Sequence, residues 1–413
     1  MTHKLSTASH SHPFSLISSS IESVPTTRLG WRGMPIPSAI TAQLPASIRA
    51  TPHVRIPALT VTASGRLIAV FDLRPSFHDL PGAISIAYRT SDDYGHTWSD
   101  LQLLIAASDE WGYGDASLIS TSDGRVLCLY TASQGLSFWD NAGVTSQRWT
   151  LRCAVSDDDG VTWQHRHLTN ELLANHPEIS SAFFSSGNGI QLSSGRLVNP
   201  LVWHSPGEHT PHVSMAMSDD AGAHWFLGEP IPGQADETKV IELADGTLAA
   251  AIRGYPQRLA AYSQDHGLSW SQAIPMRDEP GCNAGYALWN GKLALTIPQP
   301  QLAPVCESGE QFQALGDPSC GRSSSTLQDW SARHHLCLLT GSDAHNLELQ
   351  EVIDPCASAY SVAIPLPTGD LAIAWEHGNY EDILFKIIHD DGVSNDVAAP
   401  HIFHEKTREE YKR

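Results

Sequence analysis

Basic residues are scarce in this chain, which carries 25 Lys and Arg against 45 Asp and Glu, for a formal net charge of -20. They form no block that could match a run of phosphates. We therefore expect neither a nucleic acid nor an anionic membrane as a partner. An acidic protein that binds an anionic small molecule needs a local cluster of arginines that acts against its overall charge.

Cysteine patterning is also absent, because the seven cysteines are scattered and contain no Cys-x-x-Cys pair. They are Cys128, Cys153, Cys282, Cys306, Cys320, Cys337 and Cys356. Such a set predicts buried or free thiols rather than a zinc site or a disulfide framework. Residues 1–30 lack the apolar run of a signal peptide, and no stretch is apolar enough to span a membrane. We expect a cytoplasmic protein, or a secreted one if the N-terminus is truncated.

Metal-binding patterns are missing despite the 21 histidines. No His-Glu-x-x-His or comparable spacing occurs. The acidic run Asp157–Asp159 could hold calcium, but no loop with the required glutamate follows it. We expect no metal and no cofactor.

Helical periodicity is weak throughout, with short helices expected only within 168–180 and 325–333. The recurring pattern is instead a turn, a glycine and an apolar run, which indicates an all-β protein. The six runs begin at Gly65, Gly124, Gly195, Gly246, Gly291 and Gly369. One such strand would suit each unit of a repeated fold.

An octet with the pattern Ser-x-Asp-x-Gly-x-Thr-Trp marks the repeat. Its four copies, two of which have His or Ser in place of Thr, span 91–98, 156–163, 218–225 and 263–270. Asp and Gly two positions apart suit a hairpin turn, because Asp bonds nearby amides and Gly accepts a positive φ. Periodic glycine and tryptophan motifs favour a six-bladed β-propeller. We expect a flexible extension at 1–29, the propeller at 30–405 and a tail at 406–413.

An early Arg55-Ile56-Pro57 followed by these octets resembles the sialidase (neuraminidase) family, in particular bacterial exo-α-sialidases. The resemblance covers residues 50 to 390, and the octet corresponds to the Asp-box of that family. Pro57 disfavours the helical region for Ile56, which predicts Arg55 on a strand or strand end. The resemblance implies a six-bladed propeller with a site at its central axis and Asp-boxes that serve structure only.

Three catalytic residues follow from the resemblance. Asp79, on a loop before the first octet, matches the acid/base aspartate. Tyr360 in Ala359-Tyr360-Ser361 matches the nucleophilic tyrosine, and Glu237 in Asp236-Glu237-Thr238-Lys239 matches the glutamate that assists it.

The resemblance also implies residues that bind the substrate or support the site. Arg55 and Arg253 match the first and second arginines that bind the substrate carboxylate. Arg333 resembles the third, and Arg322 is its rival because the octet expected after Arg333 is decayed. The supporting residues are Glu376, which steadies the first arginine, Arg74, in a stretch that shapes the acid loop, and Asp115, which lines the substrate pocket.

These residue types suit the chemistry of sialic acid, which bears a carboxylate on its anomeric carbon. Guanidinium groups bind a carboxylate bidentately, with a geometry that lysine lacks. An ionised Asp or Glu nucleophile would be repelled by that carboxylate, whereas a neutral tyrosine would not, although its pKa near 10 demands an adjacent base. Two displacements at one carbon retain configuration. Asp79 would need its protonated form, so we expect an acidic optimum or a pKa raised by substrate.

The expected activity is therefore hydrolysis of terminal sialic acids from sialylated glycans. Other readings stay open: a trans-sialidase, an intramolecular trans-sialidase, a non-catalytic sialic-acid lectin, or a structural propeller that binds partners. The sequence leaves open the linkage preference, the form of sialic acid and the oligomeric state.

Overall fold

The computed structural model describes residues 26–390, apart from 51, 141–142, 144–145, 255, 303–331 and 379. The expected all-β class is confirmed, because strands dominate the described residues. Each of the six glycine-led runs is confirmed as a strand in the interior of a sheet. These strands are β3 (Leu67–Arg74), β7 (Val126–Ser133), β13 (Leu197–His204), β17 (Leu248–Ile252), β21 (Lys292–Pro298) and β24 (Leu371–His377).

Antiparallel hairpins extend four of these strands into separate sheets. The first contains β2 (His53–Val61), β3, β4 (Ser85–Ser91) and β5 (Gln102–Ile105). The second contains β6 (Gly112–Ser120), β7, β8 (Trp149–Ser156) and β9 (Gln164–His167), with β11 (Gly187–Asn188) added parallel to β6. The third contains β10 (Ser181–Phe184), β12 (Ile190–Gln191), β13, β14 (His212–Ser218) and β15 (Phe226–Leu227). The fourth contains β16 (Thr238–Glu242), β17, β18 (Gln257–Ser263) and β19 (Ile274–Asp278).

The remaining strands form one seven-stranded sheet. Its order is β1 (Thr27–Trp31), β25 (Asp382–Ile388), β24, β23 (Leu347–Pro365), β22 (His334–Gly341), β21 and β20 (Gly285–Trp289). The 19-residue strand β23 pairs with β22 through its first part and with β24 through its last part, so one strand serves two four-stranded units. Tyr360 lies in the last part of β23.

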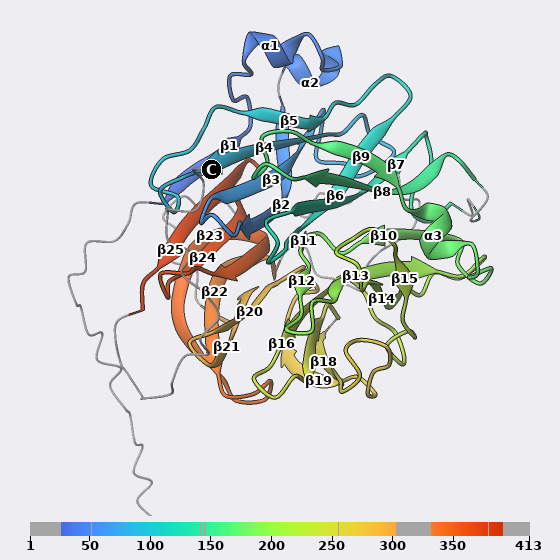
Figure 1. Ribbon diagram of the computed structural model, residues 1–413. Helices are drawn as coiled ribbons and strands as arrows, with labels where there is room; N and C mark the ends of the chain where they lie inside the picture. Colours follow the sequence, from blue (N-terminus) through green and yellow to red (C-terminus); the bar gives the residue numbers. More distant parts are fainter. Residues whose placement is uncertain are drawn as a thin grey trace, which may run out of the picture.

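The two ends of the described chain meet in this sheet, where β1 pairs antiparallel with β25 (Figure 1). Residues 27–29 therefore belong to a strand, although the sequence placed them in a flexible extension. The helices are short and lie outside the sheets: α1 (Ser38–Thr41), α2 (Ala46–Ala50) and α3 (Thr169–Leu173). The last falls within the helix expected at 168–180. Within the described ranges, no helix is long and apolar enough to cross a membrane.

The octets form the tight turns that the sequence predicted. In the first, the Ser91 hydroxyl accepts from the Gly95 amide at 2.7 Å, and Asp93 accepts from the Thr97 amide at 2.8 Å and its hydroxyl at 2.6 Å. Gly160 of the second octet leaves space for the sheet that precedes it, because a Cβ there would come within 2.6 Å of the Ile68 side chain. The turns thus pack one sheet against the next, outside the site described below.

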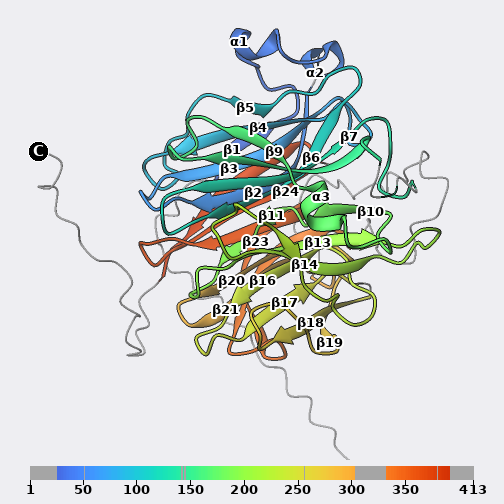
Figure 2. The same ribbon diagram turned by 45° about the vertical axis from the view of Figure 1, so that its right-hand side comes forward.

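Neighbouring sheets are held together by buried apolar side chains that form shared clusters between them. Val70 and Ile86 of the first sheet, for example, share a buried cluster with Leu118 and Val126 of the second. Figures 1 and 2 show the sheets succeeding one another in chain order.

One prediction about the cysteines is wrong: Cys356 forms a disulfide bond, whereas Cys128, Cys153, Cys282 and Cys337 are free.

Candidate active site

Arg55 lies in β2, on a strand as predicted, and its side chain is 2% exposed. Its Nε donates to Glu376 Oε1 at 3.0 Å. The same oxygen accepts from the Ile56 amide at 3.0 Å, and Glu376 Oε2 accepts from the Tyr360 amide at 3.2 Å. Ile56 has φ 58, a left-handed conformation costly for a β-branched residue, at a bulge in the pairing of β2 with β3. One buried carboxylate therefore holds a strained turn, an arginine and the backbone of Tyr360.

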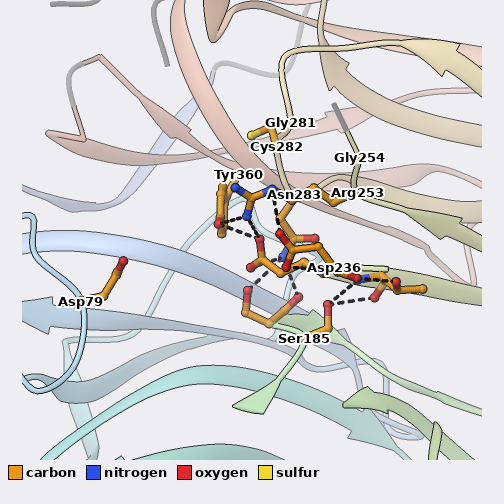
Figure 3. A network of polar contacts seen from close by, with 12 residues as sticks. Asp79, Ser185, Asp236, Arg253, Gly254, Gly281, Cys282, Asn283 and Tyr360 are labelled. Carbon is orange, nitrogen blue, oxygen red and sulfur yellow. Dashed lines mark hydrogen bonds and ion pairs between the residues drawn. The ribbon is translucent and has the colours of Figure 1, made fainter. Parts of the chain in front are cut away.

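Tyr360 makes the central contacts of the site (Figure 3). Its hydroxyl donates to Glu237 Oε2 at 2.6 Å and accepts from Arg253 Nη1 at 2.8 Å. Arg253 also forms an ion pair with Glu237 and lies 3.7 Å from Asp236 Oδ2. Burial raises the pKa of Tyr360 well above its usual value; Arg253 opposes this and Glu237 adds to it. The phenol is therefore neutral and faces a carboxylate that can take its proton.

Three guanidinium groups surround the ring of Tyr360. The Cζ atoms of Arg55 and Arg333 lie 5.5 Å from the ring centroid, and that of Arg253 lies 5.8 Å away. Arg55 lies in β2, Arg333 directly precedes β22 and Arg253 directly follows β17. The three arginines therefore come from three different four-stranded units. The rival, Arg322, lies outside the described residues.

Tyr380, which the sequence analysis did not single out, links two of these arginines. The Arg55 guanidinium stacks 4.2 Å from the ring centroid of Tyr380, and the Tyr380 hydroxyl accepts from Arg333 Nη1 at 3.0 Å. Arg333 Nη2 also donates to the Gly281 carbonyl at 2.6 Å. The only available signal was the position of Tyr380 four residues after Glu376, at the end of the same hairpin.

Asp79 lies on the loop between β3 and β4, and its side chain is 70% exposed. Arg74 Nη1 donates to its Oδ1 at 2.6 Å and to the carbonyls of Phe77 and His78 at 3.2 and 3.1 Å. Arg74 thereby shapes the loop, while Arg55 Nη1 lies 3.3 Å from the same Oδ1. Partial loss of hydration among the neighbouring groups raises the pKa of Asp79, but the charges of Arg74 and Arg55 outweigh this effect and the net pKa is lowered. In Figure 3 this residue stands apart from the network around Tyr360.

Asp115 lies in β6 at a bulge, with φ 57. Burial, then the charges of Asp72 and Asp79, raise its pKa well above the usual value. Asp72 is itself fully buried against Arg74, with a Nη2 to Oδ2 distance of 2.8 Å, and burial raises its pKa to about 6. This side of the site thus holds several carboxyl groups, and burial favours the protonated form of both Asp115 and Asp72.

A buried ion pair supports the loop on which Arg333 rests. Arg258 Nη2 lies 2.8 Å from Glu279 Oε2, both side chains are 0% exposed, and Arg258 also donates to the Cys282 carbonyl. Sequence analysis missed this pair, together with Lys239 and Asn283 beneath Glu237. Nothing in their local sequence distinguishes them from ordinary strand and turn residues. Over the ranges that the structure describes, no group of His, Cys, Asp and Glu could hold a metal ion.

The structure combines repeated Asp-box turns, sheets built from hairpins and a tyrosine surrounded by three arginines. These features define a class of Asp-box repeat proteins, and comparison with known proteins agrees. A model of the BNR repeat-like domain matches residues 39–189 and 118–373. The sialidase of Micromonospora viridifaciens is 30% identical over 346 residues, which are 79% of this chain and 50% of that protein. The chain belongs to the sialidase family of BNR-repeat proteins.

Further relatives have the same character. The sialidase of Clostridium perfringens is 28% identical over 239 residues, which are 54% of this chain and 62% of that protein. The chain thus spans about half to three fifths of the length of these two curated relatives.

Solved structures share the fold. The Hadza microbial sialidase Hz136 aligns with a TM-score of 0.67 at 22% identity, covering 81% of this chain and 65% of that one. The intramolecular trans-sialidase from Ruminococcus gnavus, in complex with oseltamivir carboxylate, aligns with a TM-score of 0.62 at 16% identity, covering 82% and 95%. These likenesses show an all-β fold of the kind found in sialidases, which are β-propellers.

Proposed function

We propose that this protein is a glycoside hydrolase, an exo-α-sialidase that removes terminal α-ketosidically linked sialic acids from glycans. One observation carries the proposal. The Tyr360 hydroxyl donates to Glu237 at 2.6 Å, while the guanidinium groups of Arg55, Arg253 and Arg333 lie within 5.8 Å of the Tyr360 ring centroid. A neutral nucleophile with its own base, set among three cations, matches a substrate that carries a carboxylate on the reacting carbon.

In this proposal the three arginines bind the substrate carboxylate through charge-assisted hydrogen bonds. Their burial matters, because a guanidinium in a low-dielectric site attracts an anion more strongly than one in water. Glu376 is 1% exposed and holds Arg55 in place, so that little reorganisation is needed when substrate arrives. Release of Asp79 from Arg55 on substrate binding would raise the pKa of Asp79 and favour its acid form.

The reaction then proceeds in two displacements. The Tyr360 oxygen bonds to the anomeric carbon as its proton passes to Glu237, and Asp79 protonates the departing glycosidic oxygen. Asp79, now ionised, takes a proton from water, whose oxygen displaces Tyr360, and Glu237 returns the proton to the phenolate. Sialidases with a tyrosine nucleophile are a recognised exception to the two-carboxylate scheme, and double displacement retains configuration.

The six glycine-led strands support a finer proposal for the architecture. Each lies inside a unit of four strands, to which β11 is added in the second sheet and β12 in the third, and β23 joins the last two units by passing from one to the other. Six such units around an axis make a six-bladed β-propeller, with β1 completing the last blade beside β25. Arg74, Arg253 and Glu376 stand at or just after the C-terminal ends of glycine-led strands, which would gather them at one face of the ring.

Hydrolysis of a fluorogenic sialoside tests the function. Wild type should release the fluorophore, and Tyr360→Phe should lower kcat by about 100-fold or more, because it removes the nucleophile and leaves the arginines. Tyr88→Phe is the matched control and should keep its activity, since the Tyr88 hydroxyl donates to Gln102 at 3.0 Å and takes no part in the proposed site. Sialoside binding without turnover by wild type would instead support a lectin.

Analysis of the first-formed product separates the remaining alternatives. Proton NMR should show the retained α-anomer of free sialic acid before it mutarotates. A sialylated acceptor, formed when lactose is added, would identify a trans-sialidase, and an anhydro sugar would identify an intramolecular one. An inverted anomer formed first would exclude the Tyr360 intermediate.

A further inference from the structure

Lys239 is a buried cation beneath the proposed active site. It lies in β16, 1% exposed, and its Nζ donates to the Ser186 carbonyl and to Asn283 Oδ1, the latter at 3.0 Å. Burying an ammonium group is costly unless its surroundings use it. Both of these partners are neutral, so neither forms the salt bridge that usually explains such a residue.

Asn283 connects this lysine to Glu237. Its Nδ2 donates to Glu237 Oε1 at 3.3 Å and to Ser186 Oγ at 3.0 Å. An asparagine amide can present either its oxygen or its nitrogen to a neighbour. An ammonium group, which can only donate, fixes the choice: the oxygen faces Lys239 and the nitrogen faces Glu237. Lys239 therefore determines which group Asn283 offers to the carboxylate.

The two carboxylate oxygens of Glu237 consequently make different contacts. Oε1 is held by Asn283, whereas Oε2 accepts the Tyr360 hydroxyl at 2.6 Å and pairs with Arg253. The carboxylate cannot rotate without losing one set of contacts. Since a misplacement of about 1 Å can cost about 100-fold in rate, an anchor on Oε1 bears directly on proton transfer at Oε2.

The surrounding backbone leaves space for the ammonium group. Gly187 has φ +111, and a Cβ there would lie 3.0 Å from Lys239 Nζ. Burial lowers the pKa of Lys239 to about 7, with Glu237 raising it and Arg258 lowering it. Glu237 directly precedes β16, and Arg258 comes from β18. The charge of Lys239 is consequently sensitive to the carboxylate on which it acts.

We propose that Lys239 is a positioning residue that acts through Asn283 to hold the carboxylate of Glu237 for proton transfer from Tyr360. The proposal rests on the function proposed above, in which Glu237 is the base. In this proposal Lys239 does not contact the substrate. Loss of the lysine should therefore affect the chemical step and leave substrate binding largely intact.

Steady-state kinetics of Lys239→Met and Lys239→Gln test this role. Methionine fills similar space without a donor, so kcat should fall by about 10-fold or more, with KM changed by less than about 2-fold. The acid limb of the pH–rate profile should move to higher pH, because ionised Glu237 loses an oriented donor. Glutamine can still donate to Asn283 and should recover part of kcat. Unchanged kcat and pH profile in Lys239→Met would overturn the proposal.

Asn283→Leu provides an independent variant that serves if Lys239→Met does not fold. It should reproduce the kcat loss, and the double variant should lose no more than the single variants, because both act along one path. Additive losses would contradict the path. Ser117→Ala is the matched control: it removes a buried 2.6 Å hydrogen bond to Asn199 and should lower stability without moving the pH–rate profile.

Crystal structures of wild type and Lys239→Met separate failure of this inference from failure of the proposed function, because they need no turnover. Both are determined below the Lys239 pKa of about 7, where the wild-type lysine is charged. Without the ammonium group the Asn283 amide should turn, and the 3.3 Å contact between Asn283 Nδ2 and Glu237 Oε1 should be lost in Lys239→Met. If wild type cleaves no sialoside, the function fails and these structures alone decide: an unchanged contact in Lys239→Met would overturn the positioning role.

Discussion

Removal of the Glu376 carboxylate should destabilise the protein strongly. The substitution Glu376→Ala takes away the acceptor of three groups, Arg55 Nε at 3.0 Å and the amides of Ile56 and Tyr360 at 3.0 and 3.2 Å. Arg55 and Glu376 are 2% and 1% exposed, so water cannot replace these contacts. Breaking a buried ion pair by removing one partner costs about 3–5 kcal/mol. Ile56 is held in a strained conformation, so the turn around it can relax once Glu376 is removed. This relaxation is the main way in which the loss of stability could be reduced.

Urea unfolding followed by circular dichroism gives the measurement. The control is Asp92→Asn, which breaks the pair between Arg66 and Asp92, whose side chains are 24% and 72% exposed. An exposed pair of this kind is worth about 1 kcal/mol or less. The reasoning would be refuted if Glu376→Ala lowered the unfolding free energy as little as Asp92→Asn does.

Three further predictions concern pH. Asp158 has a pKa lowered to about 2 by the hydrogen bonds of its turn, so Asp158→Asn should lower the thermal midpoint at pH 7 and lose this effect as the pH falls toward 2. The hydrogen bond to Asp354 raises the pKa of His377, so its contribution is complete below about pH 6 and disappears as the pH rises through the raised value. Accordingly, His377→Gln should shift the urea midpoint more at pH 6 than at pH 9. Arg74 lowers the pKa of Asp79, so Arg74→Met should move the basic limb of kcat/KM to higher pH in a pH–rate profile.

Sequence patterns predicted the repeated elements well, because those elements depend on local chemistry. A glycine that needs a positive φ, followed by an apolar run, specifies a strand after a turn, and Gly65, Gly195 and Gly369 each have φ near +92. The octets were equally readable, since their serine, aspartate and glycine bond within one turn. Where contacts come from distant segments, such signals fail, as the disulfide at Cys356 and the strand at residues 27–29 show.

The site was predictable in part through resemblance. The structure brings Arg55, Arg253, Arg333 and Tyr360 around one point, although no local pattern joins them. Tyr380 went unnoticed because its importance depends on stacking against an arginine more than 300 positions away, at 4.2 Å. Residues that act through a neighbour cannot be found by motif, since their own sequence context is that of any strand.

The pairing of Thr27 with Phe385 has a consequence for how the protein is made. During synthesis, the first strand leaves the ribosome long before its partner exists and must wait with an unsatisfied edge. Loop-closure entropy makes such distant pairings slow to form. We therefore expect the seven-stranded sheet, and with it Tyr360 and Glu376, to assemble late, so that the proposed nucleophile is set in place only after β25 has emerged.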